Sequence, residues 1–210
     1  MRRFRMFLAV LICLVVVSAS YADTLIGVNR EGKQFTLTCN VLEEHYDKTR
    51  IEVPGRGTAS LDSEFIVEIR RSDLPLTYRQ ALEKLAVGDL AEAVRLFKTC
   101  YEAQATPDWA KWYSLHQYGQ LSMKLAEIEK KPKYYESAIV GFQILVQKWP
   151  RARYAPDAEV RIGQCLARLG RLDEAAEKFQ EVAEKPDYLP LAKFRGRVGV
   201  ARVRVLKAAK

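Results

Sequence analysis

The feature that most constrains the fold is a row of small and aromatic residues at fixed distances from a glycine. An alanine stands five residues after the glycine and a phenylalanine nine residues after it. The row occurs twice, as Gly88, Ala93, Phe97 and as Gly170, Ala175, Phe179. Residues four apart share one face of a helix, where alanine permits close approach of a second helix and the aromatic ring fills the space beyond. The row therefore predicts helical hairpins with glycine at the turn.

The last unit has the fullest version of this pattern. Its small and apolar positions are Ala158, Ile162, Gly163, Leu166, Gly170, Ala175, Phe179 and Val182. The set resembles the tetratricopeptide repeat. Residues 149–182 are also similar to the repeat part of the periplasmic Tol-Pal accessory protein and of the outer-membrane β-barrel assembly lipoprotein. The resemblance covers residues 76–210. It implies a solenoid of helical hairpins that binds a protein or peptide partner in the groove lined by the first helix of each hairpin.

The middle unit is longer than the last one. The glycine of its first helix and the alanine of its second lie 19 residues apart, against 12 in the last unit. Seven extra residues correspond to about two helical turns. We therefore expect long helices near 109–129 and 134–148, joined around Pro132.

The segment before the repeats has a different period. Phe35, Leu37 and Cys39 alternate with polar residues, which predicts a strand with one apolar face. A later run places Phe65, Val67 and Ile69 on one face and Ile66, Glu68 and Arg70 on the other. Short strands with glycine turns predict a small antiparallel sheet that resembles SH3-like or Sm-like modules. The fold class expected is α+β, with a β module over 23–72 followed by the all-α repeats over 76–210.

The first 22 residues have the composition of an export signal. A basic start, MRRFR, precedes an apolar run from Met6 to Val17 and a small-residue end, Ser20-Tyr21-Ala22. The run is short for a bilayer, which needs about 20 apolar residues, so we expect cleavage rather than a retained anchor. The protein is therefore expected to be exported, to the periplasm or another part of the cell envelope.

The charge and the cysteine content limit the kinds of partner and the redox chemistry that the chain can have. Removing Arg2, Arg3 and Arg5 with the signal lowers the formal net charge from +8 to +5. Outside the cytosol such a charge favours acidic proteins or anionic envelope surfaces, and no nucleic-acid partner is expected. Three cysteines remain, Cys39, Cys100 and Cys165. They are interpreted as buried apolar residues in preference to one disulfide and a free thiol.

Catalytic patterns are absent from the sequence. Its two histidines are His45, expected in a solvated loop, and His116, expected on the long helix as a surface or groove residue. Neither has metal-ligand spacing, and no phosphate-binding loop or dinucleotide fingerprint occurs. We therefore expect no enzymatic activity, no metal and no cofactor. The three tryptophans are expected to pack in the core or between hairpins.

The repeat register supplies the candidate partner-binding residues. The positions that the resemblance places in the groove are Tyr113, His116, Gln120, Lys124, Gln164 and Arg168. Lys124 and Arg168 would attract an acidic or carboxylate partner. The leading hypothesis is a non-catalytic exported scaffold that binds its partner in this groove.

The C-terminal segment suggests an alternative. Its apolar stripe at helical spacing is Leu191, Phe194, Val198, Ala201 and Val205. The basic residues that accompany the stripe include Arg195, Arg197, Arg202 and Arg204, and no acidic residue occurs among them. The segment is interpreted as a capping helix with a soluble outer face. The alternative is a basic surface that binds anionic cell-wall polymer or membrane.

Overall fold

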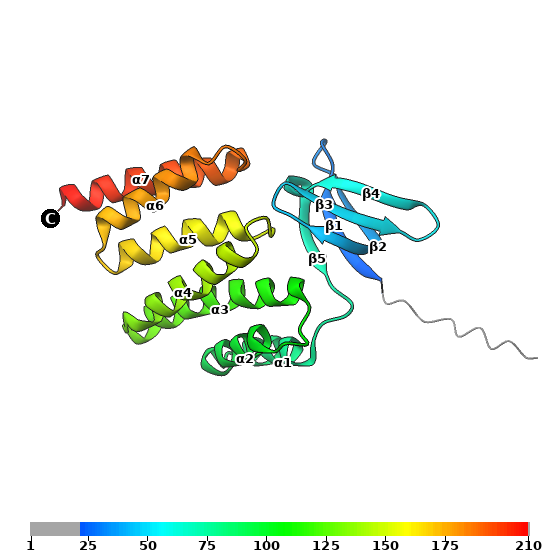
Figure 1. Cartoon of the computed structure of the whole chain (residues 1–210), viewed down its shortest axis with the longest axis horizontal. Coiled ribbons are helices and arrows are strands. Elements are labelled where there is room, and N and C mark those ends of the chain that lie inside the picture. The colour runs from blue at the N-terminus through cyan, green and yellow to red at the C-terminus, as the bar shows by residue number, and fades with distance from the viewer. Residues whose placement is uncertain (1–21, 210) are drawn as a thin grey trace, which may run out of the picture.

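The computed structural model describes residues 22–209, which form a five-stranded antiparallel sheet followed by an array of helices (Figure 1). The strands are β1 (Asp23–Val28), β2 (Gln34–Glu44), β3 (Lys48–Val53), β4 (Gly57–Asp62) and β5 (Ile66–Arg70), with the short 3-10 helix η1 (Ser63–Phe65) before β5. The helices are α1 (Leu76–Ala86), α2 (Leu90–Glu102), α3 (Asp108–Glu129), α4 (Lys133–Lys148), α5 (Ala155–Arg168), α6 (Leu172–Glu184) and α7 (Pro190–Ala208). None of the described helices is both long and apolar enough to span a bilayer. The expected export signal falls almost entirely on residues 1–21, outside the described part.

The sheet has the strand order β4-β3-β2-β1-β5. Its small apolar core is Leu25, Cys39, Val41, Ile51 and Ile66. The predicted apolar face of β2 is confirmed, because Phe35 and Leu37 pack against the same core that buries Cys39. The chain therefore has the α+β architecture expected from the change of period.

The predicted alternation in β5 holds for Ile69, which packs against the sheet core, but is wrong for Ile66 and Val67. Ile66 is 5% exposed and Val67 is 63% exposed, the reverse of the expectation. The cause is a register shift between β1 and β5: Ile26 pairs with Glu68, but Gly27 pairs with Ile66, which leaves Val67 without an opposing residue. Such a bulge reverses the faces of the residues beyond it, and alternation alone does not reveal it.

The helices form a tetratricopeptide-like array of hairpins, α1–α2, α3–α4 and α5–α6, closed by α7 (Figure 1). The two long middle helices agree with the predicted ranges and meet at Pro132. Gly88 and Gly170 have φ angles of +81° and +77° at the hairpin turns, a conformation that favours glycine. The turn prediction is confirmed at both positions.

Glycines inside the helices set how closely the hairpins pack. A Cβ on Gly119 of α3 would lie 2.4 Å from the ring of Phe142 on α4, and a Cβ on Gly163 of α5 would lie 2.7 Å from the ring of Phe179 on α6. Both rings are buried. The glycine and the aromatic residue of one hairpin therefore fit into each other, which is the packing that the repeat pattern predicts.

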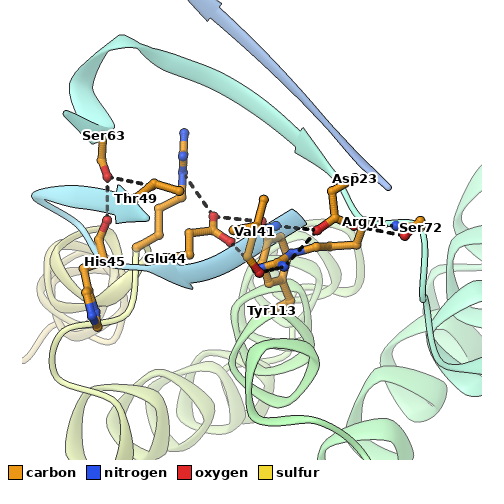
Figure 2. A network of polar contacts seen from close by, with 10 residues as sticks. Asp23, Val41, Glu44, His45, Thr49, Ser63, Arg71, Ser72 and Tyr113 are labelled. Carbon is orange, nitrogen blue, oxygen red and sulfur yellow. Dashed lines mark hydrogen bonds and ion pairs between the residues drawn. The ribbon is translucent and has the colours of Figure 1, made fainter. Parts of the chain in front are cut away.

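A buried polar network joins the sheet to the helices (Figure 2). The guanidinium of Arg71 donates to Asp23 and to Glu44, over 3.2 Å in both cases. Tyr113 of α3 donates its hydroxyl to the same Glu44 carboxylate over 2.9 Å, and Arg153 lies 3.7 Å from it. Burial raises the pKa of Glu44, against the opposing effect of the two arginines. Because its members come from both parts of the chain, the network fixes the sheet against the helical array.

A second contact between the sheet and the helices lies at the end of β2. His45 forms an isolated antiparallel bridge with Ala152, and the amide of Tyr46 donates to the carbonyl of Arg151 over 3.1 Å. The expectation that His45 lies in a solvated loop was therefore wrong. The bridge joins residues more than 100 positions apart, and a local sequence pattern does not contain that information.

Candidate functional site

Three adjoining cavities form one groove along α5 and α7. The first, of about 740 Å³, lies between η1, α3, α5 and the start of α7. It shares Asp157, Val160, Arg161 and Arg195 with a second cavity of about 300 Å³. The second shares Gln164, Phe179 and Arg202 with a third of about 380 Å³. The shared residues make the groove continuous from the sheet to the far end of α7.

Asp157 of α5 is the polar centre of this groove. Its carboxylate accepts hydrogen bonds from His116 of α3 over 2.9 Å, from Arg161 over 2.5 Å and from Arg195 of α7 over 3.1 Å. Burial alone would raise the pKa of Asp157, but the bonds from His116 and Arg161 outweigh it and hold the pKa well below its usual range. One ionised carboxylate thus connects three helices and leaves an excess of positive charge beside it.

His116 has a structural position in the floor of the first cavity. Its ring stacks on Tyr154 at 4.1 Å, and the amide of Gln120 lies 3.1 Å from its Nε2. Burial lowers the pKa of His116, against the opposing hydrogen bond to Asp157. Facing an ionised carboxylate, Nε2 of the imidazole carries the proton and donates to Asp157.

The structure brings together part of the predicted groove set. His116 and Gln120 line the first cavity, Gln164 lines the second and third, and Arg168 lines the third. Arg168 also pairs with Glu127 over 3.4 Å at the surface. The remaining two residues lie elsewhere: Tyr113 is buried under β2 with its hydroxyl on Glu44, and Lys124 is exposed on α3 but lines none of the three cavities.

The basic residues of α7 divide between two faces. Arg195 and Arg202 line the groove. Arg197 and Arg204 are exposed but line none of the three cavities. Arg202 forms no hydrogen bond or ion pair with another described residue, so its guanidinium is available to a ligand. Only part of the basic set therefore contributes to the groove.

The apolar stripe predicted for α7 is not the face that packs. Leu191, Phe194 and Val198 are 61%, 55% and 49% exposed, and all three line the groove. The buried face of α7 is instead Gly196, Gly199 and Val203. A Cβ on Gly196 would lie 2.7 Å from the backbone of α6, so this glycine permits backbone contact. A hydropathy pattern gives little weight to glycine, which is why the larger residues were assigned to the core.

Sequence reasoning also missed Asp157 and Arg161. A usable signal was present, because positions 157, 161, 164 and 168 follow helical spacing and share one face of α5. Gln164 and Arg168 were identified on that face, and extending the row toward the N-terminus finds the other two.

Comparisons with known proteins add little to this description. No protein-family model matches the chain, and no curated protein matches it. Among solved structures, MamA AMB-1 is similar with 18% identity and a TM-score of 0.28, over 63% of this chain and 81% of that chain. A multi-domain immunophilin from Arabidopsis thaliana is similar with 13% identity and a TM-score of 0.35, over 76% and 84%. At these values the likenesses carry no functional argument.

Proposed function

We propose that the protein is a non-catalytic scaffold that binds a protein or peptide partner in the groove along α3, α5 and α7. The observation that carries the proposal is the groove's composition. Leu191, Phe194 and Val198 stay largely exposed along one wall, although α7 packs against the array through Gly196, Gly199 and Val203. Large apolar side chains gathered in a concave surface are typical of interaction sites.

The charges of the groove favour an acidic partner. Arg161 and Arg195 share the single carboxylate of Asp157, and Arg202 has no partner within the described residues. A peptide with apolar anchors and neighbouring carboxylates would match both the wall and these guanidinium groups. The amino-terminal composition supports placing this activity in the cell envelope, as part of the same proposal.

Two charge reversals on α7 test the groove. Arg202 lines it, whereas Arg204 is an exposed arginine on the same helix that does not. Wild type, Arg202→Glu and Arg204→Glu would each be immobilised and exposed to an envelope extract. We expect Arg202→Glu to lose a specific bound protein that Arg204→Glu retains. Equal loss in both variants, or in neither, would contradict groove binding.

A second candidate function has its own observation. Helix α7 contains no acidic residue, and Arg197 and Arg204 are exposed on it outside the groove. This face could bind an anionic membrane or cell-wall polymer by charge attraction, which salt screens over about 8 Å at physiological ionic strength. Sedimentation with vesicles containing an anionic lipid would then require low salt and fail in Arg204→Glu. Sedimentation that neither salt nor this variant reduces would exclude the mechanism.

A further inference from the structure

All three tryptophans of the chain line one cavity, which is separate from the groove. The cavity has a volume of about 640 Å³ and lies where the end of β2 meets the start of α3 and the loop after α4. Trp109 and Trp112 come from α3, and Trp149 comes from the end of α4. Indoles combine a large apolar ring with a polar N–H and are enriched at interaction sites, so three of them at one opening between two parts of the fold favour a ligand site.

The three rings contribute differently. Trp112 is buried and stacks on Tyr113 at 4.3 Å, so it belongs to the floor. Trp109 is partly buried and has the guanidinium of Arg71 at 4.9 Å from its ring. Trp149 is partly buried and makes no ring stacking or cation–π contact with another described residue. Trp149 is therefore the ring best able to take a ligand on its face.

The indole N–H groups are also available. Within residues 22–209, none of Trp109, Trp112 and Trp149 donates its indole N–H to a protein acceptor. In the described part of the chain, none of the three indole nitrogens is a fully buried atom without a partner, so each N–H is open to solvent or to a ligand. Donors left without a protein partner around one opening can serve a bound molecule with acceptor oxygens.

The frame of the cavity is rigid. The segment after Trp149 is fixed to β2 by the bridge between His45 and Ala152 and by the hydrogen bond from Tyr46 to Arg151. The amide of Ala152 also donates to the carbonyl of Trp149 over 2.9 Å. The backbone that carries Trp149 is thus held in place before any ligand arrives, which lowers the entropic cost of binding.

The polar rim selects the kind of ligand. Carboxylates from Glu43 and Asp108 and the guanidinium of Arg151 line the same cavity. Each has one ion-pair partner outside the cavity lining, Arg50, Lys111 and Asp47 respectively, which leaves further acceptor and donor positions on each group. The Glu44 and Arg71 that also line it are paired with each other. The rim therefore offers acceptors and donors with little net charge. A sugar ring presents an apolar C–H face for an indole and hydroxyl groups that both donate and accept. A proline-rich segment lacks the backbone N–H groups that the carboxylates need.

We propose that this tryptophan-lined cavity binds an uncharged saccharide unit, with Trp149 as the stacking surface and Asp108, Glu43 and Arg151 as partners of the hydroxyl groups. The site is independent of the groove and of its protein partner. Its position between the sheet and the helices gives the protein a second binding surface.

Intrinsic fluorescence tests this proposal directly, because every tryptophan that emits lines the site. The full chain would be titrated with cellotriose, maltotriose and tri-N-acetylglucosamine, and separately with a ten-residue proline peptide. We expect a saturable spectral change with at least one saccharide. The change should disappear in Trp149→Ala and remain in the groove variant Arg202→Glu.

Each other outcome overturns the proposal. These outcomes are no response to any of the three saccharides, a response to the proline peptide alone, and a saccharide response that persists in Trp149→Ala. Circular dichroism would check folding, and if Trp149→Ala does not fold, Trp149→Phe replaces it. The smaller phenyl ring should weaken the affinity by roughly three- to tenfold, and an unchanged affinity would refute the stacking role.

Discussion

Phe179 lies between two glycines, and this arrangement supports a quantitative prediction for Gly199→Ala. A Cβ on Gly199 of α7 would lie 2.3 Å from Cδ1 and 2.4 Å from Cγ of the Phe179 ring. On the other side, a Cβ on Gly163 of α5 would lie 2.7 Å from the same ring, so the ring already touches the backbone there. Phe179 is only 3% exposed and its ring is closely packed against both glycines, so it can relax only toward the groove cavities that it borders.

Two effects of opposite sign set the magnitude. Overpacking a closed core site costs about 1–3 kcal/mol. Replacing glycine by alanine inside a helix gains about 1 kcal/mol. Since the ring is blocked on both sides, we place the clash in the upper part of its range and expect a net loss of about 1–2 kcal/mol. For a chain of this length that lowers Tm by roughly 2–8 °C.

Urea unfolding followed by circular dichroism measures this change. Ala201→Gly is the control, because Ala201 is exposed on the same helix and should lose only the helical preference, about 1 kcal/mol. Adding Phe179→Leu to Gly199→Ala should recover part of the clash, which a double-mutant cycle detects as a coupling energy. If Gly199→Ala is instead stabilised by about 1 kcal/mol, as helical preference alone would give, the described packing of α7 is incorrect.

Three further predictions concern buried polar and thiol groups. Glu44→Ala removes the carboxylate that Arg71 and Arg153 share in the buried network between the sheet and the helices, and it should lower the free energy of unfolding in urea by about 3–5 kcal/mol. Glu44→Gln should cost less, and equal losses in the two variants would contradict the pairing. Because the folded pKa of Asp157 is lowered, its contribution to stability is present above its unfolded pKa and is lost as the pH falls below about 4. Asp157→Asn should therefore lose less stability than the wild type between about pH 4 and 2, as followed by circular dichroism, and parallel curves would count against the carboxylate's role. Burial raises the pKa of the Cys165 thiol to about 12, against the opposing charge of Arg161. Mass spectrometry should therefore find Cys165 unmodified by iodoacetamide at neutral pH in the native protein and modified in urea. Labelling of the native protein would show that the thiol is accessible.

The local features of the fold were predictable from the sequence. Gly88 and Gly170 stand where the hairpins turn, and the spacing of Gly119 and Ala138 gave the longer middle helices. These features depend on residues within one or two helices, where periodicity and turn chemistry act directly. The three described cysteines are free and buried, as expected from their apolar surroundings.

The features that join distant parts of the chain were not predictable in the same way. Glu44 and Tyr113 meet across 69 positions, and His45 meets Ala152 across a still longer separation. The buried face of α7 was missed because Gly196 and Gly199 have no side chain, which is what lets α7 approach α6 closely. The groove was therefore found only in part, since its wall consists of the apolar residues that the sequence pattern assigned to the core.

Site-specific photo-crosslinking tests the central claim most directly. A benzophenone amino acid would be placed at Gln164, which lines the groove, and in a second variant at Gln143, which is exposed on α4 and lines none of its cavities. Groove binding predicts that irradiation in the native envelope produces a discrete protein adduct from position 164 and none from position 143. No adduct at position 164, or the same adduct from both positions, would contradict the assignment of this groove as the binding surface.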